Sequence, residues 1–392
     1  MTDGRTHPQP LPALQGGERG SDAFSPAACP RLVIKIGSAL LVDAAGAVRR
    51  EWLSGIVADI VARRAAGQQI AVVSSGAIAL GARRLKLPKG GRASLEDAQA
   101  AAATGQIALS HCWAELLAEE GLTAAQMLVT LDDLEDRRRY LNAAATLDRL
   151  LTLGVVPIIN ENDSVATAEI RFGDNDRLAA RIGQAAAAHG VILLSDVDGL
   201  YTANPGRDPT AKMITRVERI DARILAMADG GSASGMGSGG MTSKLAAARI
   251  AQRAGAHLAI VTGKVERPLQ AFEATGHGTV FVAERGASAR KAWLAGRLTA
   301  RGVIRVDEGA AKALGQGRSL LAAGATGIEG RFARGDVVDI AGPDGAAFAR
   351  GLIEYDAEEA ARIVGRRSDA LEAILGYAPR AALVHRDHMV LL

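Results

Sequence analysis

Two short segments, far apart in the chain, contain the residue types that could do chemistry. The segment NENDSVATAEIRFGDND at 160–176 concentrates carboxylates and side-chain amides, which suit a bound cation and a polar substrate. The segment GMGSGGMTSK at 235–244 is a glycine-rich loop that ends in a lysine, just before an expected helix, which suits phosphates. Together they predict an enzyme that moves a phosphoryl group onto a small polar acceptor.

The glycine-rich segment can present backbone amides to an anion, because glycine lets consecutive N–H groups converge. The helix expected from about Met241 would direct its positive end at the same anion, and Lys244 lies one turn inside it. A flexible surface loop is the alternative. The string GMGSGG also fits the dinucleotide pattern GxGxxG, but that pattern needs a preceding strand, and 218–229 is expected to be helical. No GxxxxGK[ST] occurs, which excludes a P-loop.

Lys35 is the second cation of interest. It lies in the apolar run RLVIKIG at 31–37, where an unpaired charge would be costly to bury. One interpretation is an edge strand whose lysine is in water. The other is that Lys35 points from the carboxyl edge of a sheet toward phosphates, with Gly37 and Ser38 leaving room for them. Lys35 and Lys244 would then bracket the transferred group, and such charge stabilisation with positioning carries most of the catalysis in phosphoryl transfer.

The acidic segment supplies six oxygen-bearing side chains: Asn160, Asn162, Asp163, Asp174, Asn175 and Asp176. Mg²⁺ usually takes one or two carboxylates together with substrate phosphates, so the others could hold an amino group or orient a lysine. An Asx-rich turn with a helix N-cap at Asp174 or Asp176 is the alternative. No histidine falls in these motifs. A carboxylate acceptor, with a pKa near ~4.3, is already ionised at pH 7 and needs no base, although Asp163 or Asp176 could act as one.

Short apolar strands alternate with helices along the first part of the chain. Strands are expected at 31–37, 69–75, 126–130, 155–160, 191–196, 257–263 and 278–282, and helices at 51–66, from about 77, and at 95–120, 133–152 and 176–188. This order predicts an α/β fold, with a mostly parallel sheet between layers of helices. Ligands of such sheets bind beyond the carboxyl ends of the strands. The motif residues follow strand ends at Gly37–Ser38, Ser74–Gly76, Asn160–Asp163 and Ser195–Asp196.

Changes in amino-acid composition along the chain also predict its domains. Residues 1–29 are rich in Pro, Gly, Ser and charge and are expected to form a disordered extension. The α/β domain should span 30–284, and a polar, basic linker should span 285–300. Residues 301–380 have short units with glycine turns, which favours a small β-rich domain, followed by a tail at 381–392.

Composition excludes several other classes of protein. The net charge of +3 on 392 residues is weak support for nucleic-acid binding. No apolar run reaches the about 18 residues of a transmembrane helix, and the N-terminus lacks the apolar stretch of a secretory signal. Cys29 and Cys112 show no metal or redox spacing, which favours free thiols in a reducing compartment. A cytoplasmic enzyme is therefore expected.

Five stretches of this sequence resemble one known family. They are KIGSALL, VVSSGAIALG, INENDSVATAEIRFGDND, SDVDGLYTANP and SGGMTSKLAAA. They are similar, in order, to the glutamate 5-kinases of the amino-acid kinase superfamily, and the resemblance covers about residues 31–380. The NEND…GDND pair and the GGM-[ST]-[ST]-K string are more specific than the general kinase pattern. The C-terminal part, with LEAILGY at 371–377, resembles a PUA domain.

The resemblance implies a reaction and a set of roles. The substrates would be ATP with Mg²⁺ and L-glutamate, whose γ-carboxylate would be phosphorylated in the first step toward proline. The catalytic set would be Lys35 and Lys244, which contact phosphates, and Asp176, which organises them. Glutamate would be bound by Ser75, Asp163, Asp174 and Asn175. ATP would be bound by Lys35, Ser195, Asp196, Ser238, Gly239, Gly240, Met241, Thr242, Ser243 and Lys244. No protein ligand for a metal is assigned.

The resemblance further implies a homo-oligomer, a dimer or tetramer, that is inhibited by proline at or near the glutamate site. Departures from the family pattern are small. Ser74 and Ser195 stand where threonine is frequent, and Thr242–Ser243 inverts a common Ser–Thr order. Each change keeps a hydroxyl group, so we expect mild effects.

Two alternatives compete with this interpretation. Another kinase of the superfamily would act on N-acetylglutamate, aspartate, carbamate or a nucleotide, but the NEND…GDND text and the trailing domain argue against it. An RNA-binding protein is the second alternative, because PUA domains elsewhere bind RNA. Across 301–380, acidic residues are about as many as Lys plus Arg, so no basic footprint supports RNA binding.

Overall fold

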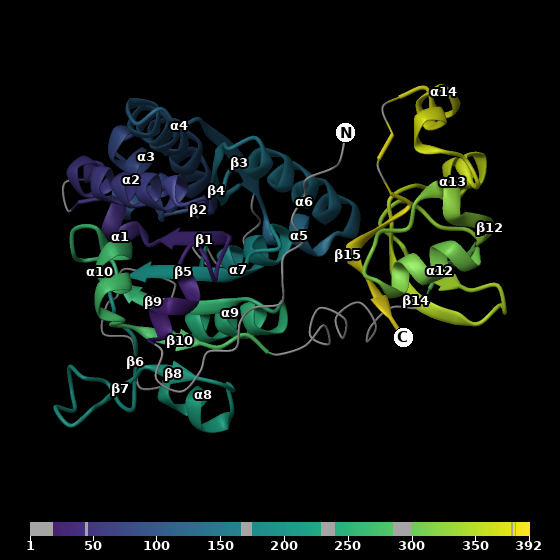
Figure 1. Cartoon of the computed structure of the whole chain (residues 1–392). Helices are drawn as coiled ribbons and strands as arrows, with labels where there is room; N and C mark the ends of the chain where they lie inside the picture. Colours follow the sequence, from purple (N-terminus) through teal and green to yellow (C-terminus); the bar gives the residue numbers. More distant parts are fainter. Residues whose placement is uncertain are drawn as a thin grey trace. The chain divides into compact units, whose positions relative to one another are not determined.

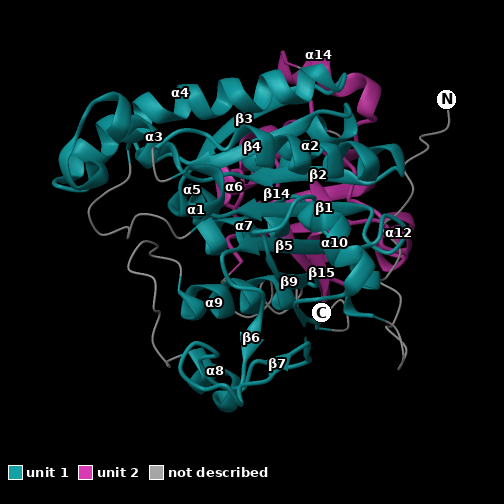
Figure 2. Ribbon diagram, turned by 90° about the vertical axis from the view of Figure 1, so that its left-hand side faces the viewer, with its two compact units in different colours: residues 1–135, 142–284 teal, residues 136–141, 285–392 magenta. Residues whose placement is uncertain are grey.

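The computed structural model describes residues 19–43, 46–165, 175–228, 240–284, 300–377, 379–380 and 382–392 (Figure 1). The chain divides into two compact units. Unit 1 comprises Met1–Glu135 and Asn142–Glu284, and unit 2 comprises Asp136–Leu141 and Arg285–Leu392 (Figure 2). Each unit has its own sheet and its own hydrophobic core.

Unit 1 is built on an eight-stranded sheet in the order β3-β4-β2-β1-β5-β9-β10-β8. Its strands are β1 Arg31–Ile36, β2 Gln69–Val73, β3 Ala124–Val129, β4 Val156–Glu161, β5 Gly190–Ser195, β8 Arg216–Val217, β9 His257–Thr262 and β10 Thr279–Phe281. All pairs from β3 to β9 are parallel, and β10 is antiparallel to β9. The prediction of a mostly parallel sheet is therefore confirmed. A separate pair, β6 Leu200–Tyr201 and β7 Met213–Ile214, was not expected from the sequence.

Helices cover both faces of this sheet (Figure 1). The α-helices of this part of the chain are α1 Ser38–Leu41, α2 Arg50–Ala65, α3 Ala77–Arg84, α4 Leu95–Glu119, α5 Leu131–Glu135, α6 Arg137–Thr152, α7 Asn175–Ala185, α8 Ala222–Ala228, α9 Met241–Arg253 and α10 Pro268–Thr275. Leu32, Ile34 and Ile36 of β1 pack into one core with residues of α2, α4 and α10. Because side chains alternate along a strand, Lys35 lies on the opposite face, where α7 packs on β1 and against α9.

The N-terminal segment corrects one prediction. Residues 19–29 are not a disordered extension, because Phe24 and Cys29 are fully buried in the core of unit 1. The Phe24 ring packs edge-on against Phe272 with centroids 5.7 Å apart. Arg63 donates to the Phe24 carbonyl oxygen at 2.9 Å, and Gln68 donates to that of Cys29 at 2.6 Å. The prediction failed because the segment is polar on average, although Phe24 and Cys29 belong to the core. Residues 1–18 lie outside the described residues.

Unit 2 contains a five-stranded sheet in the order β12-β11-β13-β14-β15. Its elements are β11 Gly302–Val306, α12 Glu308–Gly315, β12 Ala325–Gly330, β13 Val337–Ala341, β14 Ala347–Ile353, α13 Ala357–Ile363, α14 Leu371–Leu375 and β15 Val384–Leu391. The β-rich character was predicted. The expected tail at 381–392 was wrong, because β15 pairs antiparallel with β14 and places Val384 in the core.

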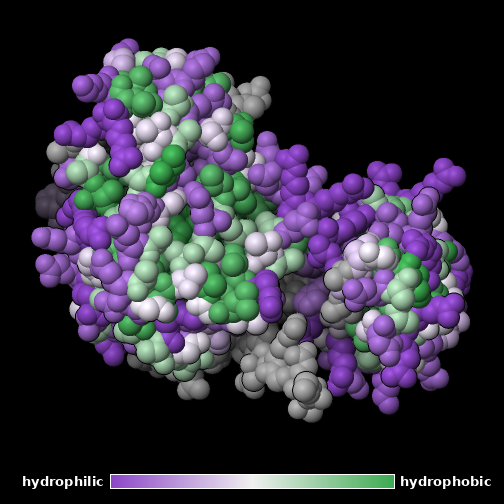
Figure 3. Space-filling model, turned by 90° about the horizontal axis from the view of Figure 1, so that it is seen from above, coloured by the Kyte–Doolittle hydropathy of each residue, from purple (hydrophilic) through white to green (hydrophobic). Residues whose placement is uncertain are grey.

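The surface of the chain mixes hydrophilic with hydrophobic residues, as the view from above shows (Figure 3). Among the large hydrophobic residues that the structure describes, Ile107 in α4 is the most exposed, at 72%. Within those same residues, no helix combines the length and the apolar character that a membrane crossing requires.

Candidate active site

The predicted site residues that the structure describes gather at one edge of the unit 1 sheet. The strands β1, β2, β4 and β5 run parallel, so their carboxyl ends meet at the same edge. The central strand β1 pairs with β2 on one side and β5 on the other, and Lys35 is in register with Val73 and Leu193. The strand order changes direction at this point, which is where open α/β sheets bind ligands.

Three charged side chains from three elements meet beyond β1. The Nζ of Lys35 lies 2.6 Å from Oδ1 of Asp176, and the Nζ of Lys244 lies 3.0 Å from Oδ2 of the same carboxylate. Asp176 is 1% exposed, and both lysines are also buried. Asp176 is the second residue of α7, and Lys244 is the fourth residue of α9. We call these three residues the lysine–aspartate triad.

The charge balance of the triad favours an anion. Burial alone would raise the pKa of Asp176, but the charges of Lys35 and Lys244 and their hydrogen bonds outweigh burial and hold that pKa below its ordinary value. Asp176 is therefore ionised at neutral pH. Two ammonium groups share one carboxylate, which leaves one positive charge in a buried setting where phosphate oxygens would be the matching ligand.

The helix α9 starts where the sequence predicted it. Gly240 is its N-cap residue, with φ −64° and ψ 178°, and the first turn contains no acidic residue. The positive end of the helix therefore suits an anion. Met241, Thr242 and Ser243 occupy this turn. Ser238 and Gly239, also predicted for ATP, lie outside the described residues.

A cluster of amides and hydroxyls lies between the ends of β2 and β4. Nδ2 of Asn175 donates to the carbonyl oxygen of Ser74 at 2.9 Å and to Oγ of Ser75 at 2.8 Å. It also lies 3.2 Å from Oδ1 of Asn160. All four residues are buried. Ser75 and Asn175, both predicted to bind the substrate glutamate, are thus in direct contact. Asn175, the first residue of α7, forms hydrogen bonds at the ends of both β2 and β4.

Two residues of α4 belong to this cluster and were missed by the sequence reasoning. Nε1 of Trp113 donates to Oγ of Ser74 at 3.1 Å, and Oε1 of Gln106 accepts from Nδ2 of Asn160 at 2.8 Å. Both are buried. Their signal in the sequence was a glutamine and a tryptophan within the otherwise alanine-rich stretch 95–120. The pattern of that stretch by itself predicts only a helix.

Asp163 follows β4 and differs from Asp176 in its environment. Burial raises its pKa to about 6, and the charge of Arg92 offsets only part of this effect. A partly buried carboxylate of this kind gains by binding a cation. Asp174, predicted to lie close to the glutamate site, falls outside the described residues. Asp176 is the second residue of α7 and its carboxylate binds both lysines, so it is not the N-cap of that helix.

On the other side of β1, Ser195 ends β5 and is buried. Its hydroxyl donates to Oδ1 of the exposed Asp196 at 3.1 Å. The backbone N–H of Gly37, after β1, donates to the carbonyl oxygen of Leu194 at 3.2 Å. A Cβ at Gly37 would lie 4.0 Å from Nζ of Lys35, so this position borders the triad.

The described residues of the site do not form a metal site held by the protein alone. Among the described residues, no group of three or more His, Cys, Asp or Glu side chains has the spacing of a metal site. Asp176 has an ammonium group at each oxygen. Mg²⁺ binds readily through phosphate oxygens, so in this chain it would arrive with the nucleotide.

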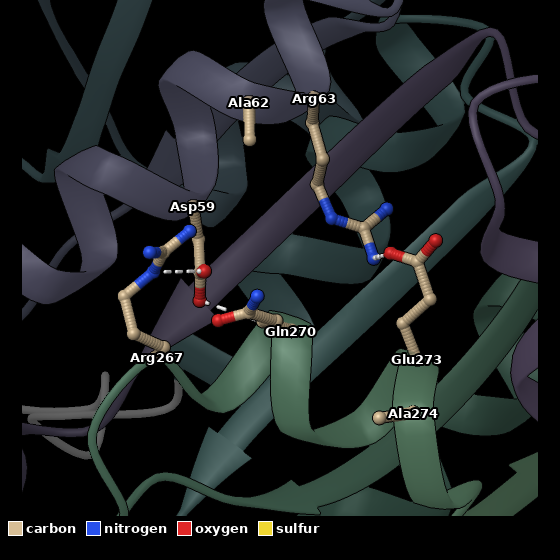
Figure 4. A pocket seen from close by; sticks show the side chains of 7 residues that line it. All are labelled: Asp59, Ala62, Arg63, Arg267, Gln270, Glu273 and Ala274. Atoms are coloured by element: carbon tan, nitrogen blue, oxygen red, sulfur yellow. Dashed lines mark hydrogen bonds and ion pairs between the residues drawn. The ribbon is translucent and has the colours of Figure 1, made fainter.

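A hollow of about 280 Å³ elsewhere in unit 1 contains none of the motif residues (Figure 4). It lies between α2 and α10, and its charged side chains pair with one another. Asp59 accepts from Nε of Arg267 at 2.6 Å and from the N–H of Leu269 at 2.9 Å, and Arg63 pairs with Glu273 at 3.0 Å. Asp59 thereby satisfies the N-terminus of α10, which indicates a structural role.

Comparisons with known proteins agree with the fold. The model of the amino acid kinase family matches residues 30–263, and the model of the PUA domain matches residues 302–375. The chain belongs to the amino acid kinase family. Its fold, a mostly parallel sheet flanked by helices and followed by a β-rich unit, agrees with that membership.

Curated relatives narrow the family further. The glutamate 5-kinase of Sphingopyxis alaskensis is 74% identical over 369 residues, which are 94% of this chain and 99% of that protein. The glutamate 5-kinase of Zymomonas mobilis is 66% identical over 369 residues, 94% of this chain and 93% of that protein. Within the superfamily, the chain therefore belongs with the glutamate 5-kinases. A solved UMP kinase from Bacillus anthracis aligns with a TM-score of 0.45 at 14% identity over 66% of this chain and 97% of that one, which carries no functional argument.

Proposed function

We propose that this protein transfers the γ-phosphoryl group of ATP to the γ-carboxylate of L-glutamate, giving L-glutamyl 5-phosphate, the first step of proline biosynthesis. The observation that carries the proposal is the buried lysine–aspartate triad at the carboxyl edge of the sheet. The high identity to curated glutamate 5-kinases supports the choice of substrate.

The triad accounts for the transfer step. An oxygen of the γ-carboxylate attacks the γ-phosphorus, the bond from that phosphorus to the β,γ-bridging oxygen breaks, and ADP leaves with the electron pair. Charge spreads over the equatorial oxygens of the transferred group. Lys35 and Lys244, fixed by Asp176, offer two ammonium groups to those oxygens. The attacking carboxylate is ionised at pH 7, so no side chain has to remove a proton.

The cluster of amides and hydroxyls around Asn175 can bind both the carboxylate and the ammonium group of a zwitterionic substrate. Oγ of Ser75 already accepts from Asn175, so its hydrogen remains able to donate to a carboxylate. Oδ1 of Asn175 is buried and has no hydrogen-bond partner within the part of the chain that the structure describes, so it can accept from an ammonium group. Asp163, whose burial disfavours an isolated charge, supplies the anion that an ammonium group would pair with.

ATP would lie against the start of α9 and the end of β5. Kinase chemistry in this family implies ATP, with Mg²⁺ as its usual companion. The backbone at Gly240 and Met241, with the hydroxyls of Thr242 and Ser243, borders Lys244 and suits phosphates. Ser195 and Asp196 would contact the nucleotide from the other side. When bound, Mg²⁺ supplies charge neutralisation between the phosphates.

The test is a substrate comparison with the full-length chain. ADP release is measured with ATP, Mg²⁺ and L-glutamate, and the acyl phosphate is trapped with hydroxylamine as the hydroxamate. We expect turnover with L-glutamate and little with N-acetylglutamate or aspartate. Phosphorylation of N-acetylglutamate in the absence of activity on glutamate would contradict the proposal.

Two further properties belong to the same proposal. We expect a homo-oligomer, dimer or tetramer, which light scattering on the purified chain would measure. We also expect L-proline to inhibit in competition with glutamate, because both are amino acids with the same α-ammonium and α-carboxylate groups. A cytoplasmic location and the absence of RNA binding stay predictions from the sequence.

A further inference from the structure

We propose that Gln106 of α4 is a positioning residue that orients Asn160 and, through it, Asn175, so that the site offers an acceptor oxygen to the substrate's ammonium group. This inference rests on the proposed function and deepens it. Gln106 lies outside every motif that the sequence analysis selected. It acts through a chain of side-chain amides, each of which must choose which end to present.

The chain starts within α4. Nε2 of Gln106 donates to Oγ of Ser110, one helical turn later, at 3.1 Å. This bond turns Oε1 of Gln106 the other way, where it accepts from Nδ2 of Asn160 at 2.8 Å. The amide of Gln106 is buried, so a reversed orientation would set its donor against the donor of Asn160 and cost a buried hydrogen bond.

Asn160 passes the orientation on. Because Nδ2 of Asn160 donates to Gln106, Oδ1 of Asn160 faces two donors. These are the N–H of Glu161 at 2.9 Å and Nδ2 of Asn175 at 3.2 Å. A flipped Asn160 would oppose both donors with its own N–H groups. Gln106 and the backbone N–H of Glu161 therefore favour the same orientation, in which the oxygen end of Asn160 meets Asn175, and Gln106 supplies the acceptor for the nitrogen end.

Asn175 ends the chain. Its Nδ2 faces three acceptors: the carbonyl oxygen of Ser74 at 2.9 Å, Oγ of Ser75 at 2.8 Å and Oδ1 of Asn160 at 3.2 Å. The end that remains is Oδ1, which is buried and unpartnered among the described residues. An oxygen in that position favours a ligand group that donates, such as an ammonium, over one that only accepts.

The backbone holds Gln106 in place. The helices α3 and α4 cross so closely that a Cβ at Gly105 would lie 1.8 Å from the carbonyl oxygen of Ala77, and one at Gly81 would lie 1.7 Å from that of Ala101. The start of α3 directly follows Ser75 and Gly76. Gln106, adjacent to Gly105, is thus held at a fixed distance from the substrate residues by backbone contact.

The test compares Gln106→Met with the wild type. Methionine has a similar volume and no amide, so the helix packing stays while the acceptor for Asn160 is lost. We expect the KM for L-glutamate to rise about tenfold, in line with one lost buried hydrogen bond, while kcat and the KM for ATP change less than about twofold. Glutarate lacks the ammonium group. The preference for L-glutamate over glutarate in kcat/KM should therefore fall by about tenfold as well.

Two controls separate orientation from packing. Gln106→Glu keeps an acceptor oxygen and should restore the KM for glutamate to within about threefold of the wild type. Ile107→Gln alters the next residue of the same helix, whose side chain is 72% exposed, and should leave all constants unchanged. Thermal melting of each variant reports on the fold.

The outcomes are distinct. If the wild type does not phosphorylate glutamate, the proposed function is wrong, and the role of Gln106 is wrong with it. If the wild type is active and Gln106→Met keeps its KM and its preference over glutarate, only the role of Gln106 is wrong. The same holds if kcat, both KM values and the melting temperature worsen together, since that pattern describes a residue needed only for packing.

Discussion

Asp176 is the residue on which both candidate catalytic lysines depend. It is 1% exposed and pairs with Lys35 at 2.6 Å and Lys244 at 3.0 Å. Removing one lysine leaves the carboxylate paired with the other, whereas removing Asp176 leaves two buried cations facing each other. Loss of one partner from a buried pair typically costs about 3–5 kcal/mol. Lysine variants are therefore the better probes of chemistry, because the remaining pair preserves the fold.

Lys244→Ala should lose nearly all turnover and remain folded. We expect kcat to fall by at least about 10²–10³-fold, the effect of removing one preorganised charge from a transition state. The melting temperature should change little, because Lys35 still neutralises Asp176. Lys264→Ala, at an exposed position after β9, is the matched control. A near-normal kcat for Lys244→Ala would show that the phosphate role is wrong.

Asp163 should make glutamate affinity depend on pH. Burial raises the pKa of its carboxyl to about 6, so the free enzyme loses the ionised form as the pH falls below that value. If the ionised form pairs with the ammonium group, the KM for glutamate should rise as the pH falls from 7 to 5, while the KM for ATP stays level. Asp163→Asn should have a high KM for glutamate that no longer depends on pH. A parallel slope in variant and wild type would exclude Asp163 as the titrating group.

A fall in pH should weaken glutamate binding through Asp163, but the same carboxyl should make the fold of the free enzyme more stable as the pH falls. Its folded pKa is raised, so between about pH 4 and pH 6 the folded chain binds more protons than the unfolded chain. Its contribution therefore stabilises the fold as the pH falls through that window. The difference in melting temperature between wild type and Asp163→Asn should accordingly depend on pH there and level off above it. A difference of constant size would contradict the raised pKa.

At the scale of elements, the crossing of α3 and α4 sets how closely α4 approaches the substrate edge. Gly105→Ala would place a methyl group 1.8 Å from the carbonyl oxygen of Ala77, so the helices must separate. We expect a loss of stability of about 1–3 kcal/mol, typical of overpacking, and a higher KM for glutamate. Gly315→Ala, in a helical position with open space around it, should be neutral or stabilising. Equal stability of the two variants in denaturant titration would refute the close crossing.

Sequence patterns predicted the strands well, because buried parallel strands are short apolar runs with clear ends. The strand at 31–37 and that at 191–196 match β1 Arg31–Ile36 and β5 Gly190–Ser195 to within one residue. Sequence patterns predicted helices less well where the helical periodicity continues across an interruption of the helix. The single helix expected at 133–152 is two helices, α5 and α6. Gln106 and Trp113 stand out in the alanine-rich stretch 95–120, but their role could not be predicted, because it depends on which strand ends α4 covers.

The two units differ in what they contribute. The triad, the amide cluster and Asp163 all belong to unit 1. Unit 2 has a core of its own, which includes Ile304, Ile340 and Tyr355. Its chain also shows no excess of basic residues across 301–380, which is the footprint that nucleic-acid binding requires. The chemistry should therefore not depend on unit 2.

A chain ending at Glu284 tests this independence. Since each unit buries its own hydrophobic core, the truncated chain should fold and phosphorylate L-glutamate with a kcat within about threefold of the full chain. Its stability should fall, because Asp136–Leu141, which contains the start of α6, groups with unit 2 and would lose its neighbours. Circular dichroism melting and the hydroxamate assay measure the two effects separately. A folded but inactive truncation would mean that unit 2 takes part in the reaction, and the assignment of the whole site to unit 1 would then be wrong.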